Sequence, residues 1–190
     1  MKPLLLRGGI IAGSLLLVLY GLYDLTRRRM RRQADDSGLA LAFELVEGES
    51  LAEVLARGPM APADVRRALL DICGALTAAH ARRQVHGDLR AQNVRLTADG
   101  AAKVAPAAQA DAEATTEADL QALALLAYEM LTGRRPEETE EGEEITSVTE
   151  LRPELPAKLD DFFAAALGGN PAQRPADAAA FCAAFEACWS

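Results

Sequence analysis

Apolar residues dominate the first part of this chain. Residues 4–23 contain a single charge, Arg7, which lies near the start of the run. About 20 apolar residues, rising 1.5 Å each in a helix, cross the roughly 30 Å hydrocarbon core of a bilayer. The run therefore predicts one N-terminal transmembrane helix.

The residues after this run predict its orientation. Five arginines follow it closely: Arg27, Arg28, Arg29, Arg31 and Arg32. A cleaved signal peptide is the alternative, but no small-residue cleavage site is present. Arginines beside a membrane helix remain on the cytoplasmic side. We expect residues 1–33 to form an uncleaved, single-pass anchor in the inner (cytoplasmic) membrane, with its N-terminus outside and residues 34–190 in the cytoplasm.

Beyond the anchor, apolar residues recur mainly at helical spacing. The spacing predicts a short helix capped by Ser50 and a longer one over about 63–82. A third helix begins at Thr116 and ends at Gly133, with Asp119 in the position of a capping-box partner. Two more helices are expected over 159–167 and from about Pro175 onward. In the last of these, Phe181, Ala184, Phe185 and Cys188 should line the buried side.

Two short segments favour β-structure instead. Residues 39–46 form an apolar run that fits a buried strand, and Asp99-Gly100 separates two short apolar segments, 94–96 and 102–104, as in a hairpin. The expected fold is therefore mainly α, with a small β-hairpin.

Charge is unevenly distributed between the two parts of the chain. Residues 1–35 carry a net +5, whereas the remainder carries a net −13. The acidic body argues against nucleic-acid binding, because phosphates would be repelled. An acidic run, Glu137–Glu144, is expected to be a solvated connection rather than a dock for a basic partner.

Metal-binding residues are scarce. The chain has three cysteines, without a C-x-x-C pair, and two histidines. These cannot form a zinc site at the usual spacings. We expect reduced, mostly buried thiols, no metal and no cofactor.

One stretch has the spacing of a catalytic loop. QVHGDLRAQNVRL places Asp88 two residues after His86 and Asn93 five residues further on. Such an aspartate can act as a base when a metal ion and a nucleotide are held beside it. The surrounding residues decide whether this loop retains that chemistry.

In its order of motifs, residues 39–185 resemble the C-terminal lobe of a protein kinase of the bacterial Ser/Thr type. ELVEGESLAEVLARG is similar to the hinge and the following helix, and ALTAAHARRQVHGDLRAQNVRL to the long helix and catalytic loop. ADLQALALLAYEMLTGRRP matches a further helix without a gap, and NPAQRP the turn after the penultimate helix. The resemblance implies a kinase C-lobe-like domain over residues 34–190.

Several parts that a kinase needs have no counterpart in this chain. The glycine-rich loop and the lysine-bearing strand of the N-terminal lobe are missing upstream. Pro106 stands where the family has its metal-binding aspartate. The activation segment is reduced to about ten residues before Asp119. Within the loop, Gly87 replaces an arginine, and Arg95 replaces the apolar residue under the adenine.

These losses indicate a degenerate site rather than a working one. Asp119 holds the place of the family aspartate that binds the backbone of the catalytic loop. We therefore expect His86, Asp88, Asn93 and Asp119 to form a structural polar network. Arg174 lacks its family partner; it is expected to pair elsewhere, for example with Glu117, or to be exposed.

The leading interpretation is a membrane-anchored pseudokinase that is not an enzyme. It would act as a scaffold or regulatory subunit for an unknown membrane or cytoplasmic protein, or associate with itself. The alternative is a pseudokinase that binds ATP without catalysis, which Asp88 and Asn93 favour. The remote alternative is a Ser/Thr kinase completed in trans by a partner.

Overall fold

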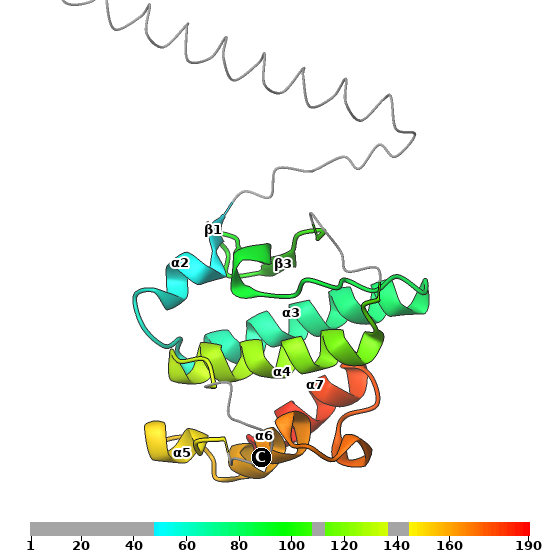
Figure 1. Cartoon of the computed structure of the whole chain (residues 1–190). Coiled ribbons are helices and arrows are strands. Elements are labelled where there is room, and N and C mark those ends of the chain that lie inside the picture. Colours follow the sequence, from blue (N-terminus) through cyan, green and yellow to red (C-terminus); the bar gives the residue numbers. More distant parts are fainter. Residues whose placement is uncertain (1–47, 108–112, 137–144) are drawn as a thin grey trace, which may run out of the picture. The chain divides into compact units, whose positions relative to one another are not determined.

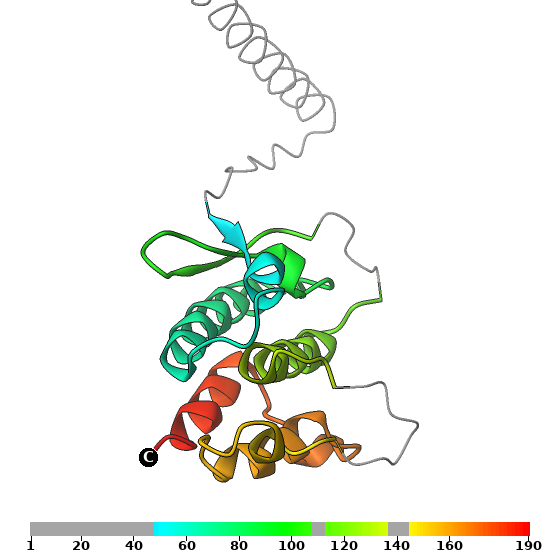
Figure 2. The same cartoon turned by 90° about the vertical axis from the view of Figure 1, so that its left-hand side faces the viewer.

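Two long helices form the centre of the domain. α3 (Pro62–Ala81) and α4 (Thr116–Thr132) lie side by side (Figures 1 and 2). Each buries an apolar stripe at helical spacing, including Leu69 and Ile72 on α3 and Leu123 on α4. The structure thus confirms both predicted helices.

The computed structural model describes residues 48–107, 113–136 and 145–190. These residues belong to a unit that runs from Leu45 to Ser190. Four expectations concern residues outside this description: the apolar run 4–23, its flanking arginines at 27–32, the strand at 39–46 and the acidic run at 137–144. No helix formed by the described residues is long and apolar enough to span a bilayer.

A small sheet covers one side of α3 (Figure 1). It contains β1 (Glu49–Ser50), β2 (Val94–Leu96) and β3 (Ala102–Val104), antiparallel in the order β1-β2-β3. The β2–β3 hairpin was expected, whereas β1 lies just after the predicted strand at 39–46. The sheet is therefore larger than the hairpin alone.

The helix after β1 begins as the sequence predicts. α2 (Leu51–Leu55) is capped by Ser50, whose hydroxyl accepts the Glu53 N–H (3.2 Å) while the Glu53 carboxylate accepts the Ser50 N–H (2.8 Å). This reciprocal capping box fixes the path of the chain from strand to helix.

Three helices form a second layer against α3 and α4: α5 (Val148–Leu151), α6 (Lys158–Leu167) and α7 (Ala178–Ala187) (Figure 2). The short α5 was not predicted. The predicted start of α7 near Pro175 is wrong, because the Asp177 side chain caps the helix by accepting the Ala180 N–H (2.7 Å). Ala184 is exposed rather than buried.

Aromatic side chains gather in this second layer. Phe162 makes edge-to-face contacts with Phe163, Phe181 and Phe185, at centroid distances of 5.2, 5.0 and 5.5 Å. Most of the aromatic residues in the described part of the chain thus join α6 to α7. The cysteines are unpaired, and burial raises the pKa of the Cys73 thiol, which favours the protonated form.

The loop between α3 and β2 as candidate functional site

The loop between α3 and β2 is turned by residues with unusual backbone angles. Gly87 has φ +70°, and Arg83, just after α3, has φ +58°. A short 3₁₀ turn, η1 (Ala91–Asn93), then leads into β2. Glycine adopts this left-handed conformation without steric cost, so it suits the position between His86 and Asp88.

Asp119, on the first turn of α4, binds the backbone of this loop through its side chain. Its carboxylate accepts the His86 N–H at Oδ2 and the Gly87 N–H at Oδ1, both at 2.8 Å. The residue is only 1 % exposed. The expected contact with the loop backbone is therefore present, but the capping-box position is wrong: Thr115 caps α4 instead, accepting the Ala118 N–H.

His80, near the end of α3, is a member of this network that the sequence interpretation missed. Its Nε2 lies 2.8 Å from Asp119 Oδ2. His80 follows the buried Leu76 by four residues and so falls on the same helical face. That spacing was the available signal, because a histidine on a buried face requires a polar partner.

His86 joins the loop to the end of β3. Its Nε2 lies 2.8 Å from the Ala105 carbonyl, and its Nδ1 lies 3.2 Å from the Asp88 N. Since a carbonyl only accepts and an N–H only donates, Nε2 carries the proton and Nδ1 accepts from Asp88. Both ring nitrogens of His86 are thus engaged in hydrogen bonds that join the loop to the end of β3.

The Asp88 carboxylate is engaged by its own neighbours. Arg90 Nε lies 2.9 Å from Oδ1 and Nη2 donates to Oδ2 at 3.0 Å, while the Asn93 amide donates to Oδ2 at 2.8 Å. The same amide nitrogen also donates to the Asp88 carbonyl (2.7 Å). Both oxygens of the Asp88 carboxylate are thus engaged by donors from the same loop.

Two further positions lie outside this network. Arg95, on β2, donates from Nη1 to the Gly48 carbonyl (3.2 Å). Arg174 donates from Nε and Nη2 to the Gly168 carbonyl at 3.3 and 2.9 Å. Arg174 therefore caps the end of α6 and is half-buried, so the suggested pairing with Glu117 is wrong.

Comparison with known proteins shows to which superfamily the chain belongs. The chain is 30 % identical to the serine/threonine-protein kinase PknL of Mycobacterium tuberculosis over 187 residues, covering 77 % of this chain and 46 % of the relative. It is 27 % identical to PknE of the same species, covering 73 % of this chain and 31 % of the relative. The chain belongs to the protein kinase superfamily. Its described part is mainly helical with a three-stranded sheet, as expected for a kinase C-lobe-like region.

A third kinase-superfamily relative, PknH of Mycobacterium bovis, is 28 % identical over 180 residues, covering 75 % of this chain and 30 % of that protein. No protein-family model matches the chain. From the coverages given above, the chain spans less than half the length of each of these three relatives. In all three comparisons the aligned stretch is longer than the part of this chain that it covers, so each relative has internal residues without a counterpart here.

The residues of this loop do not fit the magnesium ions that kinases use. Mg²⁺ requires oxygen ligands in near-octahedral geometry. The Asp88 oxygens accept hydrogen bonds from Arg90 and Asn93, and Pro106, next to Ala105, offers no side-chain oxygen. Of these residues, Asn93 alone keeps a side-chain oxygen that faces no donor, and one such ligand does not hold the ion. We therefore derive no reaction step through a bound metal.

Proposed function

We propose that this chain is a catalytically inactive pseudokinase, anchored in the cytoplasmic membrane, that acts by binding another protein. The observation that carries the proposal is the position after β3. His86 fixes the Ala105 carbonyl against the loop, and the next residue is Pro106. A kinase needs a metal-binding aspartate at this point to neutralise the transferred phosphate.

Two further observations support the loss of phosphotransfer. The ion pair of Arg90 with Asp88 occupies the carboxylate that would act as base. The gaps against all three relatives agree with a shortened activation segment between β3 and α4, where substrate would bind. A protein without these parts retains the helical scaffold and its surface, which favours a role in protein binding.

An assay of phosphate incorporation tests the proposal that the chain is catalytically inactive. The full chain, incubated with labelled ATP and Mg²⁺ or Mn²⁺, should label neither itself nor a generic protein substrate above the level of an Asp88→Ala variant. Thermal unfolding with and without ATP and Mg²⁺ addresses the ATP-binding alternative, because a ligand of the native state raises the melting temperature. Labelling that disappears in Asp88→Ala would refute the proposal.

The sequence alone supports membrane anchoring, through the apolar run 4–23 and the arginines at 27–32. Protease protection in inverted membrane vesicles provides the test. Residues 34–190 should be digested from the outer, cytoplasmic face of such vesicles, and the full chain should resist extraction by alkaline carbonate. A chain starting at residue 36 should be recovered without the membrane.

A further inference from the structure

The side of the domain formed by α3 and α7 has an exposed apolar centre. In Figure 2, α7 lies directly below α3, and no other described helix lies outside them on this side. Leu70, on α3, is 59 % exposed, and no other large apolar side chain in the described part of the chain is exposed. We name this surface the α3–α7 face; it consists of Leu70, Gly74, Thr77, Ala78, Ala179 and Ala183, all of them exposed.

Side-chain contacts fix the position of α7 along α3. Arg66 donates from Nη2 to Glu186 Oε2 at 2.6 Å, and its guanidinium lies 5.5 Å from the centre of the Trp189 ring. Ala183 precedes Glu186 by three residues, so it lies on the side of α7 that is next to α3. The helix α7 therefore adds small apolar side chains to the surface beside Leu70.

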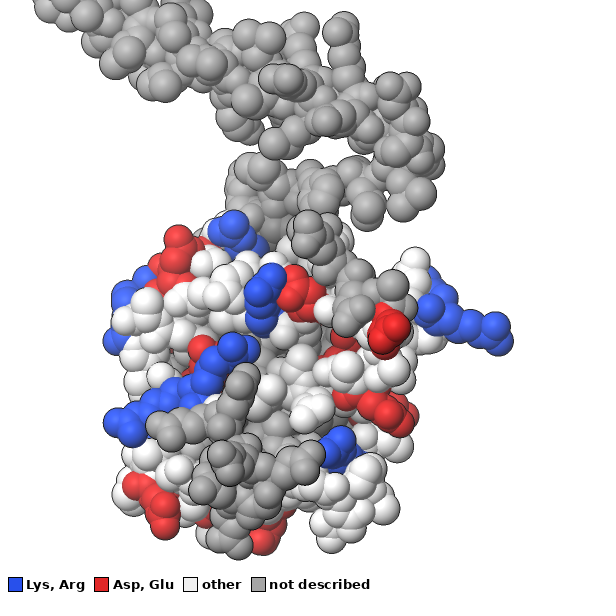
Figure 3. Space-filling model, in the orientation of Figure 1, with Lys and Arg blue, Asp and Glu red and all other residues white. Residues whose placement is uncertain are grey.

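No charged residue belongs to the α3–α7 face. Its one hydroxyl, on Thr77, donates to the Cys73 carbonyl at 2.7 Å and needs no further partner. The neighbouring Arg67 reaches toward the β2–β3 turn, where its Nη1 would lie 2.9 Å from a Cβ added to Gly100. By contrast, the side of the domain shown in Figure 3 carries acidic and basic side chains scattered over it. An exposed apolar surface without charges at its centre is typical of an interface.

Leu70 and Gly74 make the α3–α7 face complementary to itself. They lie four residues apart, about one helical turn, and therefore on the same side of α3. A Cβ added at Gly74 would meet no atom within 4 Å, so the space above this glycine is open to a side chain from outside. In an antiparallel pair with twofold symmetry, Leu70 of each copy packs over Gly74 of the other, because such a pair joins the same two positions twice.

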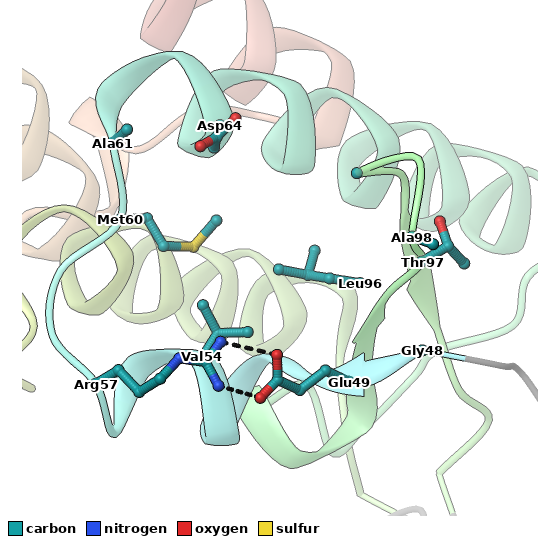
Figure 4. Close-up of a pocket in the computed structure, with 11 residues that line it drawn as sticks. Gly48, Glu49, Val54, Arg57, Met60, Ala61, Asp64, Leu96, Thr97 and Ala98 are labelled. Atoms are coloured by element: carbon teal, nitrogen blue, oxygen red, sulfur yellow. Dashed lines mark hydrogen bonds and ion pairs between the residues drawn. The ribbon is translucent and has the colours of Figure 1, made fainter.

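Two charges on α3 fit the same arrangement. Asp64 projects from the first turn of α3 (Figure 4), and Arg82 is the residue that ends the helix; both are exposed, and neither forms an ion pair with another described residue. They lie eighteen residues apart, which is five turns at about 3.6 residues each, so they share one side of the helix. Their midpoint, position 73, is one position from the midpoint of Leu70 and Gly74. One twofold axis therefore brings both pairs together.

We propose that the α3–α7 face is a homodimer interface, in which two copies of this chain pack with their α3 helices antiparallel. A second copy is selected over another protein because two independent pairs match about one axis: Leu70 meets Gly74 at the centre, and Asp64 meets Arg82 at the rim. An apolar centre with charges at its rim is the usual composition of an interface. This inference goes beyond the proposed function, because it holds whether or not the chain transfers phosphate.

Sedimentation velocity of the full chain in detergent micelles tests the centre of the interface. The wild-type chain should form a dimer, and Leu70→Glu should raise the dissociation constant of that dimer at least about tenfold, because the new charge would be buried against apolar side chains. The control Ala164→Glu, at an exposed position of α6, should leave the constant unchanged. A wild-type chain that stays monomeric, or a dimer that a folded Leu70→Glu leaves intact, would overturn the proposal.

Charge reversal tests the antiparallel arrangement, and it still does so should Leu70→Glu misfold. Asp64→Arg and Arg82→Asp should each weaken the dimer about three- to tenfold, because each places two like charges together. The double variant restores opposite charges and should return the dissociation constant to within about twofold of wild type. Single variants without effect, or a double variant without recovery, would refute this interface and leave the inactive-pseudokinase proposal intact. Phosphate incorporation by the full chain would refute only the latter.

Discussion

Asp119 and Asp88 lie close to the same loop but use their carboxylates in opposite ways. Asp119 is buried and receives donors from residues 32 to 39 positions away in the sequence. The Asp88 side chain is 21 % exposed, and its partners Arg90 and Asn93 lie within five positions. Asp119 joins separate parts of the fold, whereas Asp88 completes a local turn. The two aspartates therefore stabilise the same loop in different ways, one through distant parts of the fold and one locally.

The largest expected effect is that of Asp119→Ala. Removing this carboxylate leaves two backbone N–H groups and His80 without their acceptor, which should reduce the free energy of unfolding by about 3–5 kcal/mol. Urea unfolding followed by circular dichroism measures the change. The control Glu117→Ala, exposed on the same helix turn, should stay within about 0.5 kcal/mol. Similar losses in both variants would contradict the long-range role of Asp119.

His86→Ala should have the next largest effect. It leaves the Ala105 carbonyl and the Asp88 N–H without their partner, at a cost of about 1–3 kcal/mol for an unsatisfied buried group. Hydrogen exchange should also quicken at β3 (Ala102–Val104), because His86 ties the end of this strand to the loop. Unchanged exchange at β3 would show that the strand does not depend on His86.

Gly87→Ala tests the backbone that presents its N–H to Asp119. At φ +70° an alanine costs about 1–2 kcal/mol. The control is Gly74→Ala in the interior of α3, where a Cβ would meet no atom within 4 Å. This second change should instead stabilise the protein by about 0.5–1 kcal/mol. Opposite signs in the two unfolding curves are thus expected; a stabilised Gly87→Ala would disprove the strained turn.

Asp160 is partly buried, and its contribution to stability should depend on pH. Burial opposes its ionisation most strongly, but hydrogen bonds from Thr149 and Ser147 outweigh it and hold the pKa of the Asp160 carboxyl below its usual range. A lowered folded-state pKa contributes stability above the unfolded pKa of about 3.9, and this contribution is lost as pH falls through the folded value.

Accordingly, Asp160→Asn should lower the free energy of unfolding by about 1 kcal/mol at pH 7. The difference from wild type should shrink as pH drops below about 4. Urea midpoints measured between pH 7 and pH 3 show whether this occurs. A difference that stays constant over this range would mean that the Asp160 charge plays no part.

The smallest effect is expected for Asp88→Asn. Its ion pair with Arg90 is partly exposed, and exposed pairs contribute about 0–1 kcal/mol. The free energy of unfolding should therefore change by less than about 1 kcal/mol, several-fold less than for Asp119→Ala. A loss as large as that of Asp119→Ala would end the contrast between the two aspartates.

The sequence by itself determined the longer helices and the motif order. Helical spacing predicted α3 and α4, because their buried faces repeat over many turns, and Ser50 marked the start of α2 through its capping chemistry. The order of motifs indicated the kinase superfamily before any comparison. The four-residue helix α5 was not predicted, because it is too short to show helical spacing. The start of α7 was misplaced, because it depends on the Asp177 cap rather than on the nearby Pro175.

Apart from the contact of Asp119 with the loop backbone, only the tertiary structure decided what the polar residues contact. His80 and Asp119 are 39 positions apart, and no local pattern indicates that they meet. Arg174 likewise donates to the Gly168 carbonyl rather than pairing with a carboxylate, because its partner depends on where α6 ends. Sequence periodicity reports which face of an element is buried, whereas contacts between elements depend on how those faces pack together.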